Sequence, residues 1–295
     1  MAASEPAVGP PAQAIQRLQP GDAEAVWPLS IEAGWNQIAA DWRLMIGSGS
    51  AFGIKDAAGT WIASALAFPL GPAVSWISMV LVTKRERGQG HGTRLLLRCM
   101  AEVEQSGAAM GLDATEFGRP IYLPLGFRDV YPLSRWSAGK GIRGAVDSPP
   151  GIVIRVARVG DLPRIIDYDR SRSGFQRGAV LDNLLSRAPG IAHVAERAGG
   201  DLVGYGLGRD GHRATHIGPV MAEGEAIGLA LISHALARAD RAVILDVPDR
   251  HGAVGQWLEA QGASAPRRFM RMLRGVAPAV EDGSRIFALA GPELA

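Results

Sequence analysis

The chain has 295 residues, of which 47% are hydrophobic and 20% are charged, and its formal net charge at pH 7 is +2. This composition is typical of soluble globular proteins, and the length is sufficient for two domains of ordinary size. A charge so close to zero argues against the concentrated basic surface that nucleic acid or an anionic membrane requires.

The chain begins with MAASEPAVGPPAQA, residues 1–14, which has neither the basic start nor the apolar core of a signal peptide. We expect a disordered tail and a cytoplasmic protein. No segment reaches the ~18 apolar residues of a membrane span. The single cysteine, Cys99, excludes an internal disulfide.

The first half alternates between helical and strand patterns. A helix broken near Pro28 is expected within residues 20–46, with Trp42 in the core. The segments that follow predict a hairpin (51–71), a strand (75–82), a helix (92–105), a strand (108–115), a short helix (119–126) and a final strand (127–138). Residues 139–150 are rich in glycine and proline and predict a linker.

The second half repeats this order at a spacing of about 140 residues. Its expected elements are a strand and helix (152–170), a hairpin (191–211), a strand, loop and helix (214–239), and a further strand and helix (242–263). We therefore predict a mixed α/β fold with two copies of one domain, at residues 15–138 and 151–295.

Three alternate glycines, Gly88, Gly90 and Gly92, lie between the predicted strand 75–82 and the helix that follows. The free N–H groups and the dipole of a helix N-terminus bind anions, so this loop predicts a phosphate site. It does not end in the Gly-Lys-Ser/Thr of a P-loop. It also lacks the Gly-x-Gly-x-x-Gly spacing, directly after the strand, of a dinucleotide site.

Residues 87–92, RGQGHG, resemble the Arg/Gln-x-x-Gly-x-Gly/Ala signature of the GCN5-related N-acetyltransferases, the GNAT superfamily. About thirty residues later, IYLPLGF (121–127) resembles the Tyr-x-x-x-Gly-Phe segment of the same family. The resemblance covers residues 15–137. GWNQIAADW, LDAT, YGLGRDGHRATHIGPV and FALAGPEL further resemble a bacterial subgroup in which a complete N-terminal domain precedes a degenerate C-terminal one.

The resemblance implies acetyl-CoA as acetyl donor, with its pyrophosphate held by the glycine loop. The backbone N–H groups of residues 79–81 are candidates to polarise the thioester carbonyl. The expected cofactor-binding residues are Met79, Val80, Leu81, Val82, Arg87, Gly88, Gln89, Gly90, His91, Gly92 and Thr93.

For catalysis, the resemblance makes Tyr122 the candidate that gives a proton to the departing thiolate, although it could also be a packing residue at the edge of the site. Three candidates remain for the base that must neutralise the amine. They are Asp113, which could instead cap the following short helix, Glu116, and a chain of water molecules.

The acceptor pocket is expected to include Trp35, Asn36 and Gln37, although Trp35 is equally suited to the core. From the second half, Arg209 and Arg213 are candidates for a substrate carboxylate, unless both are ordinary surface arginines. That half lacks the glycine signature and has Trp257 where the tyrosine is expected, so we predict that it binds no acetyl-CoA.

We therefore expect an enzyme that acetylates a primary amine of a small molecule. The alternatives are a non-catalytic acetyl-CoA sensor or scaffold, and a protein lysine acetyltransferase. We expect no nucleic acid or membrane partner, and a monomer or homodimer. His212 and His216 lack a third ligand nearby, so no metal site is predicted.

Overall fold

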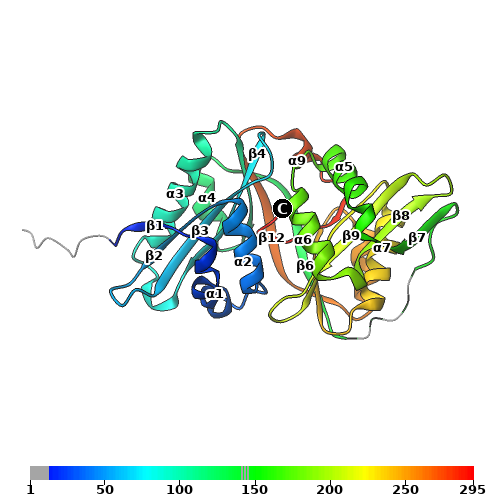
Figure 1. Ribbon diagram of the computed structural model, residues 1–295, viewed down its shortest axis with the longest axis horizontal. Helices are drawn as coiled ribbons and strands as arrows, with labels where there is room; N and C mark the ends of the chain where they lie inside the picture. Colours follow the sequence, from blue (N-terminus) through cyan, green and yellow to red (C-terminus); the bar gives the residue numbers. More distant parts are fainter. Residues whose placement is uncertain (1–12, 141, 143, 145) are drawn as a thin grey trace, which may run out of the picture.

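The computed structural model describes residues 13–140, 142, 144 and 146–295, and its chain forms two lobes side by side (Figure 1). Most of the predicted tail and three positions of the predicted linker (141, 143 and 145) therefore lie outside the described residues. No helix among the described residues is long and apolar enough to cross a membrane.

Apart from the short strand β1, which the sequence did not predict, the first half has the predicted order of elements. They are β1 (Ile15–Arg17), α1 (Ala23–Glu32), α2 (Ala39–Ser48), β2 (Ser50–Lys55), β3 (Trp61–Pro69), β4 (Val74–Val82), α3 (His91–Glu104), β5 (Ala109–Thr115), α4 (Arg119–Tyr122) and β6 (Arg128–Ala138). The expected break at Pro28 is wrong, because α1 continues through it and the chain leaves the helix only after Glu32. A proline removes one helical hydrogen bond, and burial of Val26 and Leu29 maintains the helix.

The second half contains four elements that the sequence did not predict, α6, β12, α9 and β13. Its elements are β7 (Ile152–Val156), α5 (Leu162–Ser173), α6 (Gly178–Arg187), β8 (His193–Arg197), β9 (Leu202–Arg209), β10 (Thr215–Ala222), α7 (Glu225–Arg238), β11 (Val243–Pro248), α8 (Gly252–Ala260), β12 (Ser264–Arg274), α9 (Pro278–Asp282) and β13 (Ile286–Ala288).

The described strands form one continuous sheet in the order β1-β2-β3-β4-β5-β12-β6-β11-β10-β9-β8-β7, with β13 paired to β10. If each half formed its own sheet, β6 would lie next to β5 and β12 would lie next to β11. Instead β12 pairs with β5, and β6 pairs with β11. The two halves have exchanged their last long strands, which cross the centre of the molecule (Figure 1). The sheet therefore does not follow the predicted division of the chain.

Two buried ion pairs lie across the exchanged strands. Asp113 on β5 is directly opposite Arg271 on β12, and Arg135 on β6 is directly opposite Asp246 on β11. Each arginine donates two hydrogen bonds of 2.8–2.9 Å to its carboxylate. Burial of Asp246 opposes its charge, but Arg135 outweighs that effect and lowers its pKa. Removing one member of either pair would leave a buried charge without a partner.

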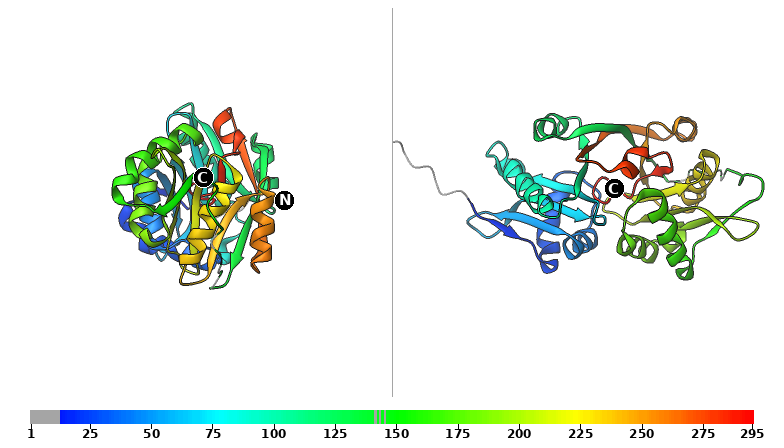
Figure 2. Two further views of the ribbon diagram at one scale, coloured as in Figure 1. Left: turned by 90° about the vertical axis from the view of Figure 1, so that its right-hand side faces the viewer. Right: turned by 90° about the horizontal axis from the view of Figure 1, so that it is seen from above.

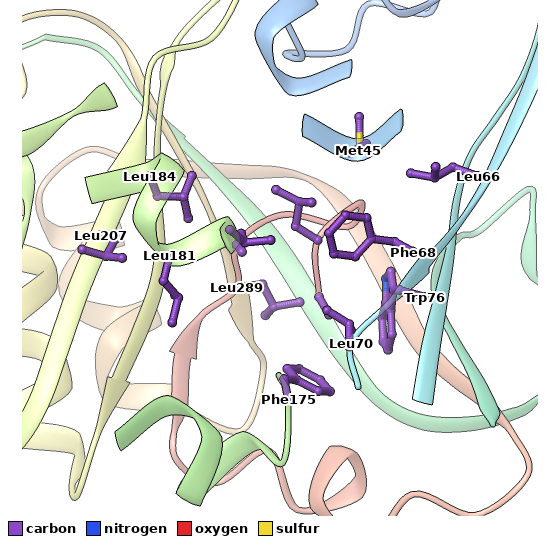
Figure 3. Packing of buried hydrophobic residues seen from close by; sticks show 14 of the residues in the cluster. Met45, Leu66, Phe68, Leu70, Trp76, Phe175, Leu181, Leu184, Leu207 and Leu289 are labelled. Atoms are coloured by element: carbon purple, nitrogen blue, oxygen red, sulfur yellow. The ribbon is translucent and has the colours of Figure 1, made fainter. Parts of the chain in front are cut away.

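The helices cover the sheet in two sets. Helix α3 packs with β2–β5 in one apolar cluster, and α7 packs in the corresponding cluster of the second half. Side chains from α1, α2, α5 and α6 share a third cluster that spans both halves. Figure 3 shows Leu289, from the C-terminal segment, within this cluster near Leu70 and Phe175. The C-terminus lies at the centre of the molecule (Figure 2).

Candidate active site

The glycine loop runs from β4 to α3 and turns through two left-handed residues. Gly88 and Gly90 both have φ +79, a region that favours glycine. A Cβ at either position would meet no atom within 4 Å, so this backbone faces open space. The first intrahelical bond is from Arg94 N to Gly90 O, at 3.0 Å. The N–H groups of the first turn therefore remain available to an anion.

His91, the first residue of α3, has a buried ring that is only 6% exposed. Neither of its ring nitrogens has a hydrogen-bond partner among the described residues. A buried polar group of this kind normally has a partner, which a ligand can supply. His91 borders a cavity of about 400 Å³ beside the loop, which we call the loop cavity. The unsatisfied ring and the glycine backbone both fit a pyrophosphate.

The predicted cofactor residues divide between two cavities. The loop cavity is lined by Val80, Val82, Arg87, Gly88, Gly90, His91, Gly92 and Thr93. Residues 79–82 and Arg87 also line a second cavity of about 570 Å³, which we call the inner cavity. Gln89 lines neither of these cavities. Its side-chain amide instead donates to Glu86 at 2.9 Å.

Strand β4 opens the inner cavity because it separates from β5. The two strands pair only where residues 74–76 face residues 109–111. Beyond that point β4 has one residue more than β3, a bulge at residues 79 and 80. Met79 has φ +52, and Ser64 Oγ donates to its carbonyl at 2.8 Å. Because of the bulge, Met79 and Val80 take no part in the regular pairing of β4 with β3, and their backbone lies beside the inner cavity.

Tyr122, at the end of α4, lines both the loop cavity and the inner cavity. Its ring packs edge-on against Phe127, with ring centroids 5.9 Å apart. Burial raises the pKa of the Tyr122 hydroxyl, which therefore keeps its proton at neutral pH. Tyr122 lies where the two cavities meet, and its hydroxyl is a proton donor.

Two of the three expected acceptor residues in the first half line the inner cavity. They are Trp35 and Gln37, and the side-chain oxygen of Gln37 has no hydrogen-bond partner among the described residues. Asn36 does not line it. Its side-chain oxygen accepts from the N–H groups of Arg213 and Ala214 at 2.9 and 3.0 Å. Asn36 therefore joins the two halves.

The expectation that Arg209 and Arg213 line the acceptor pocket is wrong. Arg209 is 1% exposed and pairs with Asp41 on α2 and with Glu293 near the C-terminus. Arg213 is exposed, and within the described part of the chain its guanidinium reaches only Gly34 O, at 3.4 Å. The sequence pattern could not reveal these contacts, since all of them join distant parts of the chain.

The two carboxylates that were candidate bases have different surroundings. Both oxygens of Asp113 accept from Arg271 at 2.9 Å, and the carboxylate is fully buried. Burial raises the pKa of Asp113, and Arg271 opposes that shift. Asp113 also does not cap α4, because Gly118 N donates to Thr115 Oγ1 instead. Glu116 is exposed and lines neither cavity.

Sequence reasoning missed the residues that the exchanged strands and the C-terminal segment bring to the inner cavity. Arg135, Arg267, Phe269, Pro292 and Glu293 all line it. Arg135 is held by Asp246, whereas Arg267 forms no ion pair among the described residues and lies over the Phe269 ring at 5.1 Å. Burial, together with the charge of Arg135, lowers the pKa of Arg267. The only signal was FALAGPEL, which marked the C-terminal segment without giving its position.

Comparison with known proteins agrees with this architecture. The family model described as an acetyltransferase (GNAT) domain matches residues 165–288, within the second half. YitH, an uncharacterized N-acetyltransferase of Bacillus subtilis, is 24% identical over 234 residues, 78% of this chain and 80% of the relative.

Solved structures show the same fold over the whole length. A putative acetyltransferase of Pyrococcus horikoshii covers 100% of both chains with a TM-score of 0.74 and 17% identity. A tandem GNAT protein from the clavulanic acid biosynthesis pathway has a TM-score of 0.62 and 12% identity, covering 90% of this chain and 99% of that one. Residues 165–288 therefore match a GNAT domain, and the chain as a whole is similar to an N-acetyltransferase and has the fold of tandem GNAT proteins.

Proposed function

We propose that the protein transfers the acetyl group of acetyl-CoA to a primary amine of a small molecule. The observation that carries this proposal is the position of Tyr122, whose side chain borders both the loop cavity and the inner cavity. A donor held along the loop cavity and an acceptor held in the inner cavity would meet at this residue.

The donor site is formed by the glycine loop, the first turn of α3, His91 and the bulge of β4. When bound, acetyl-CoA supplies the acetyl group as a thioester, so that a C–N bond forms as the C–S bond breaks and the sulfur takes up a proton. Tyr122 holds a proton on its hydroxyl at the junction of the cavities. The Val80 N–H, freed by the bulge, is available to the carbonyl oxygen.

The acceptor site favours a small molecule because both halves of the chain surround it. Trp35 and Gln37 line the inner cavity from the first half, whereas Arg267, Phe269 and Glu293 line it from the second. A cavity lined from both halves favours a small molecule over a lysine carried on a protein surface. The guanidinium of Arg267, which forms no ion pair with any described residue, suits an acidic group on the part of the acceptor that does not react.

The test is incubation of the full chain with acetyl-CoA and a panel of amines, with thiol release and N-acetyl product measured together. The panel pairs small amines with and without a carboxylate, and adds lysine-containing peptides. We expect turnover with small amines and equal amounts of thiol and product. Acetyl-CoA binding without thiol release would instead favour the sensor, and turnover only with peptides would favour a protein acetyltransferase.

A further inference from the structure

The C-terminal segment, residues 289–295, runs from the second half into the first. Leu289 N donates to Asp246 O at 2.9 Å. Trp76 and Ser78 of β4 donate to the carbonyl oxygens of Pro292 and Glu293, at 2.9 and 3.3 Å. The segment is therefore bonded to β4 next to the bulge, where it borders the inner cavity.

The Glu293 side chain is held in one position. It is 3% exposed, and Oε1 accepts from Arg209, which is itself paired with Asp41 at 2.6 Å. Gly291 has φ +120, and a Cβ there would lie 2.8 Å from Oε2 of Glu293. Only glycine leaves room for the carboxylate at this place. Among the described residues, Oε2 has no hydrogen-bond partner and is not fully buried.

Glu293 is also the available carboxylate of the inner cavity. The other carboxylate that lines this cavity is Asp113, and both of its oxygens are engaged by Arg271. A primary amine resembling the lysine side chain has a pKa near ~10.4 and is almost entirely an ammonium at pH 7. An ammonium cannot attack a thioester, so the reaction needs a group to accept its proton.

We infer that Glu293, delivered by the C-terminal segment, is the catalytic residue that receives the acceptor's ammonium and removes its proton. The inference rests on the proposed function. One N–H bond of the ammonium breaks as the O–H bond at Oε2 forms, which leaves a neutral amine and a carboxylic acid. The acid then returns its proton to solvent. Among the described residues, the charged or titratable groups that interact with Glu293 from neighbouring elements are Asp113, Arg135, Arg209 and His216, and Asp41 shares Arg209 with it.

The test is Glu293→Gln in the full chain, a change that keeps the hydrogen bond from Arg209 but removes the proton acceptor. At pH 7 we expect kcat/KM for the amine to fall about 100-fold, within the usual range for a positioned base. The variant should recover as pH rises toward the amine's own pKa, because only its neutral fraction then reacts. An amine that is already neutral at pH 7 should react equally fast with variant and wild type.

A structural role predicts a different pattern, and two variants separate them. Glu293→Asp keeps a proton acceptor and should retain the wild-type shape of the pH profile. Glu259→Gln makes the same chemical change on the exposed face of α8 and should alter neither rate nor profile. A loss in Glu293→Gln that is equal at every pH and for every amine would overturn the inference.

The outcomes also separate this inference from the proposed function. Wild-type turnover with an unchanged profile in Glu293→Gln overturns the inference alone. Transfer of the pH effect to Glu116→Gln overturns it in favour of that residue. A wild-type protein that acetylates no amine of the panel overturns both.

Discussion

In both halves of the molecule two neighbouring parallel strands separate and leave a gap in the sheet, but the gap is occupied differently. In each half the fourth strand carries a two-residue bulge at the same place, residues 79–80 of β4 and residues 218–219 of β10. In each half that strand then separates from its parallel neighbour, β5 or β11, after two or three paired residues. The opening stays free in the first half and becomes the inner cavity.

In the second half, the gap beside the bulge is filled and one backbone N–H group is missing. Strand β13 pairs with Val220 and Met221 of β10, so that it occupies the region beside the bulge. Pro219 stands at the bulge position that Val80 holds in the first half, and proline has no N–H to offer a carbonyl oxygen. This supports the prediction that the second half binds no acetyl-CoA. The site can be lost while the fold is kept.

The segment that fills the second opening continues into the first. Residues 286–288 form β13, and Pro292 and Glu293 then line the inner cavity. His216 lies 3.1 Å from Leu289 O and supports the segment between these two places. The second half therefore contributes its own C-terminal end to the inner cavity of the first half.

The largest expected effect is the loss of acetyl-CoA binding in Gly90→Leu. The side chain would enter the open space that the loop offers the pyrophosphate, and calorimetry should detect no binding. Because Gly90 has φ +79, stability should also fall by about 1–3 kcal/mol, which thermal unfolding measures. The matched change is Gly224→Leu at the start of α7, where the backbone is extended at φ −162. If Gly224→Leu also lost acetyl-CoA affinity, both halves would bind it and the comparison would fail.

A smaller effect is expected for Tyr122→Phe, which removes only a hydroxyl. Turnover should fall by about 100-fold, the contribution of a positioned proton donor, with acetyl-CoA affinity unchanged. Trp257→Phe is the matched change in the second half and should leave turnover as it is. Steady-state kinetics of the two variants checks this, and a fully active Tyr122→Phe would remove the acid role.

Arg267 tests whether the exchanged strand contributes to acceptor specificity. For an acceptor with an acidic group, Arg267→Gln should raise KM by roughly 10- to 100-fold, since a hydrogen bond to a charged group is worth about 1.5–3 kcal/mol. The kcat should change less. Its neighbour Arg268 is exposed, so Arg268→Gln is the control. Equal KM values for carboxylate and amide forms of one amine, in the wild-type chain, would contradict this role.

The smallest effect concerns pH and the support of the C-terminal segment by His216. Burial lowers the pKa of His216 to about 4 from an ordinary 6.5, so the folded chain keeps this ring neutral where the unfolded chain is protonated. Its stabilising contribution is complete above pH 6.5 and is lost as the pH falls toward 4, by about 1.4 kcal/mol per unit. Denaturant unfolding at pH 6.5 and 5.5 should show a steeper loss in wild type than in His216→Gln. An equal loss of unfolding free energy between pH 6.5 and 5.5 in both proteins would mean that the His216 ring takes up no proton on unfolding.

The sequence by itself determined the local structure and the glycine loop. Alternate apolar runs and glycine-containing turns predicted the strands and hairpins, because these signals lie within a few residues of the elements they specify. The three glycines before α3 indicated the loop for the same reason. Pro28 misled the prediction because a single missing bond counts less than the burial of its neighbours.

Only the tertiary structure decided which strands are neighbours and which residues line the inner cavity. Strands β6 and β12 can satisfy the same hydrogen bonds in either half, so nothing local distinguishes the exchanged arrangement from the simple one. The exchange of strands placed Asp113 opposite Arg271, and the two form a buried ion pair. Arg209 pairs with Glu293 and does not line the inner cavity, whereas Arg267 and Glu293 both line it. Their positions depend on contacts between residues 84 to 158 or more positions apart in the chain, and such contacts leave no periodic pattern in a single sequence.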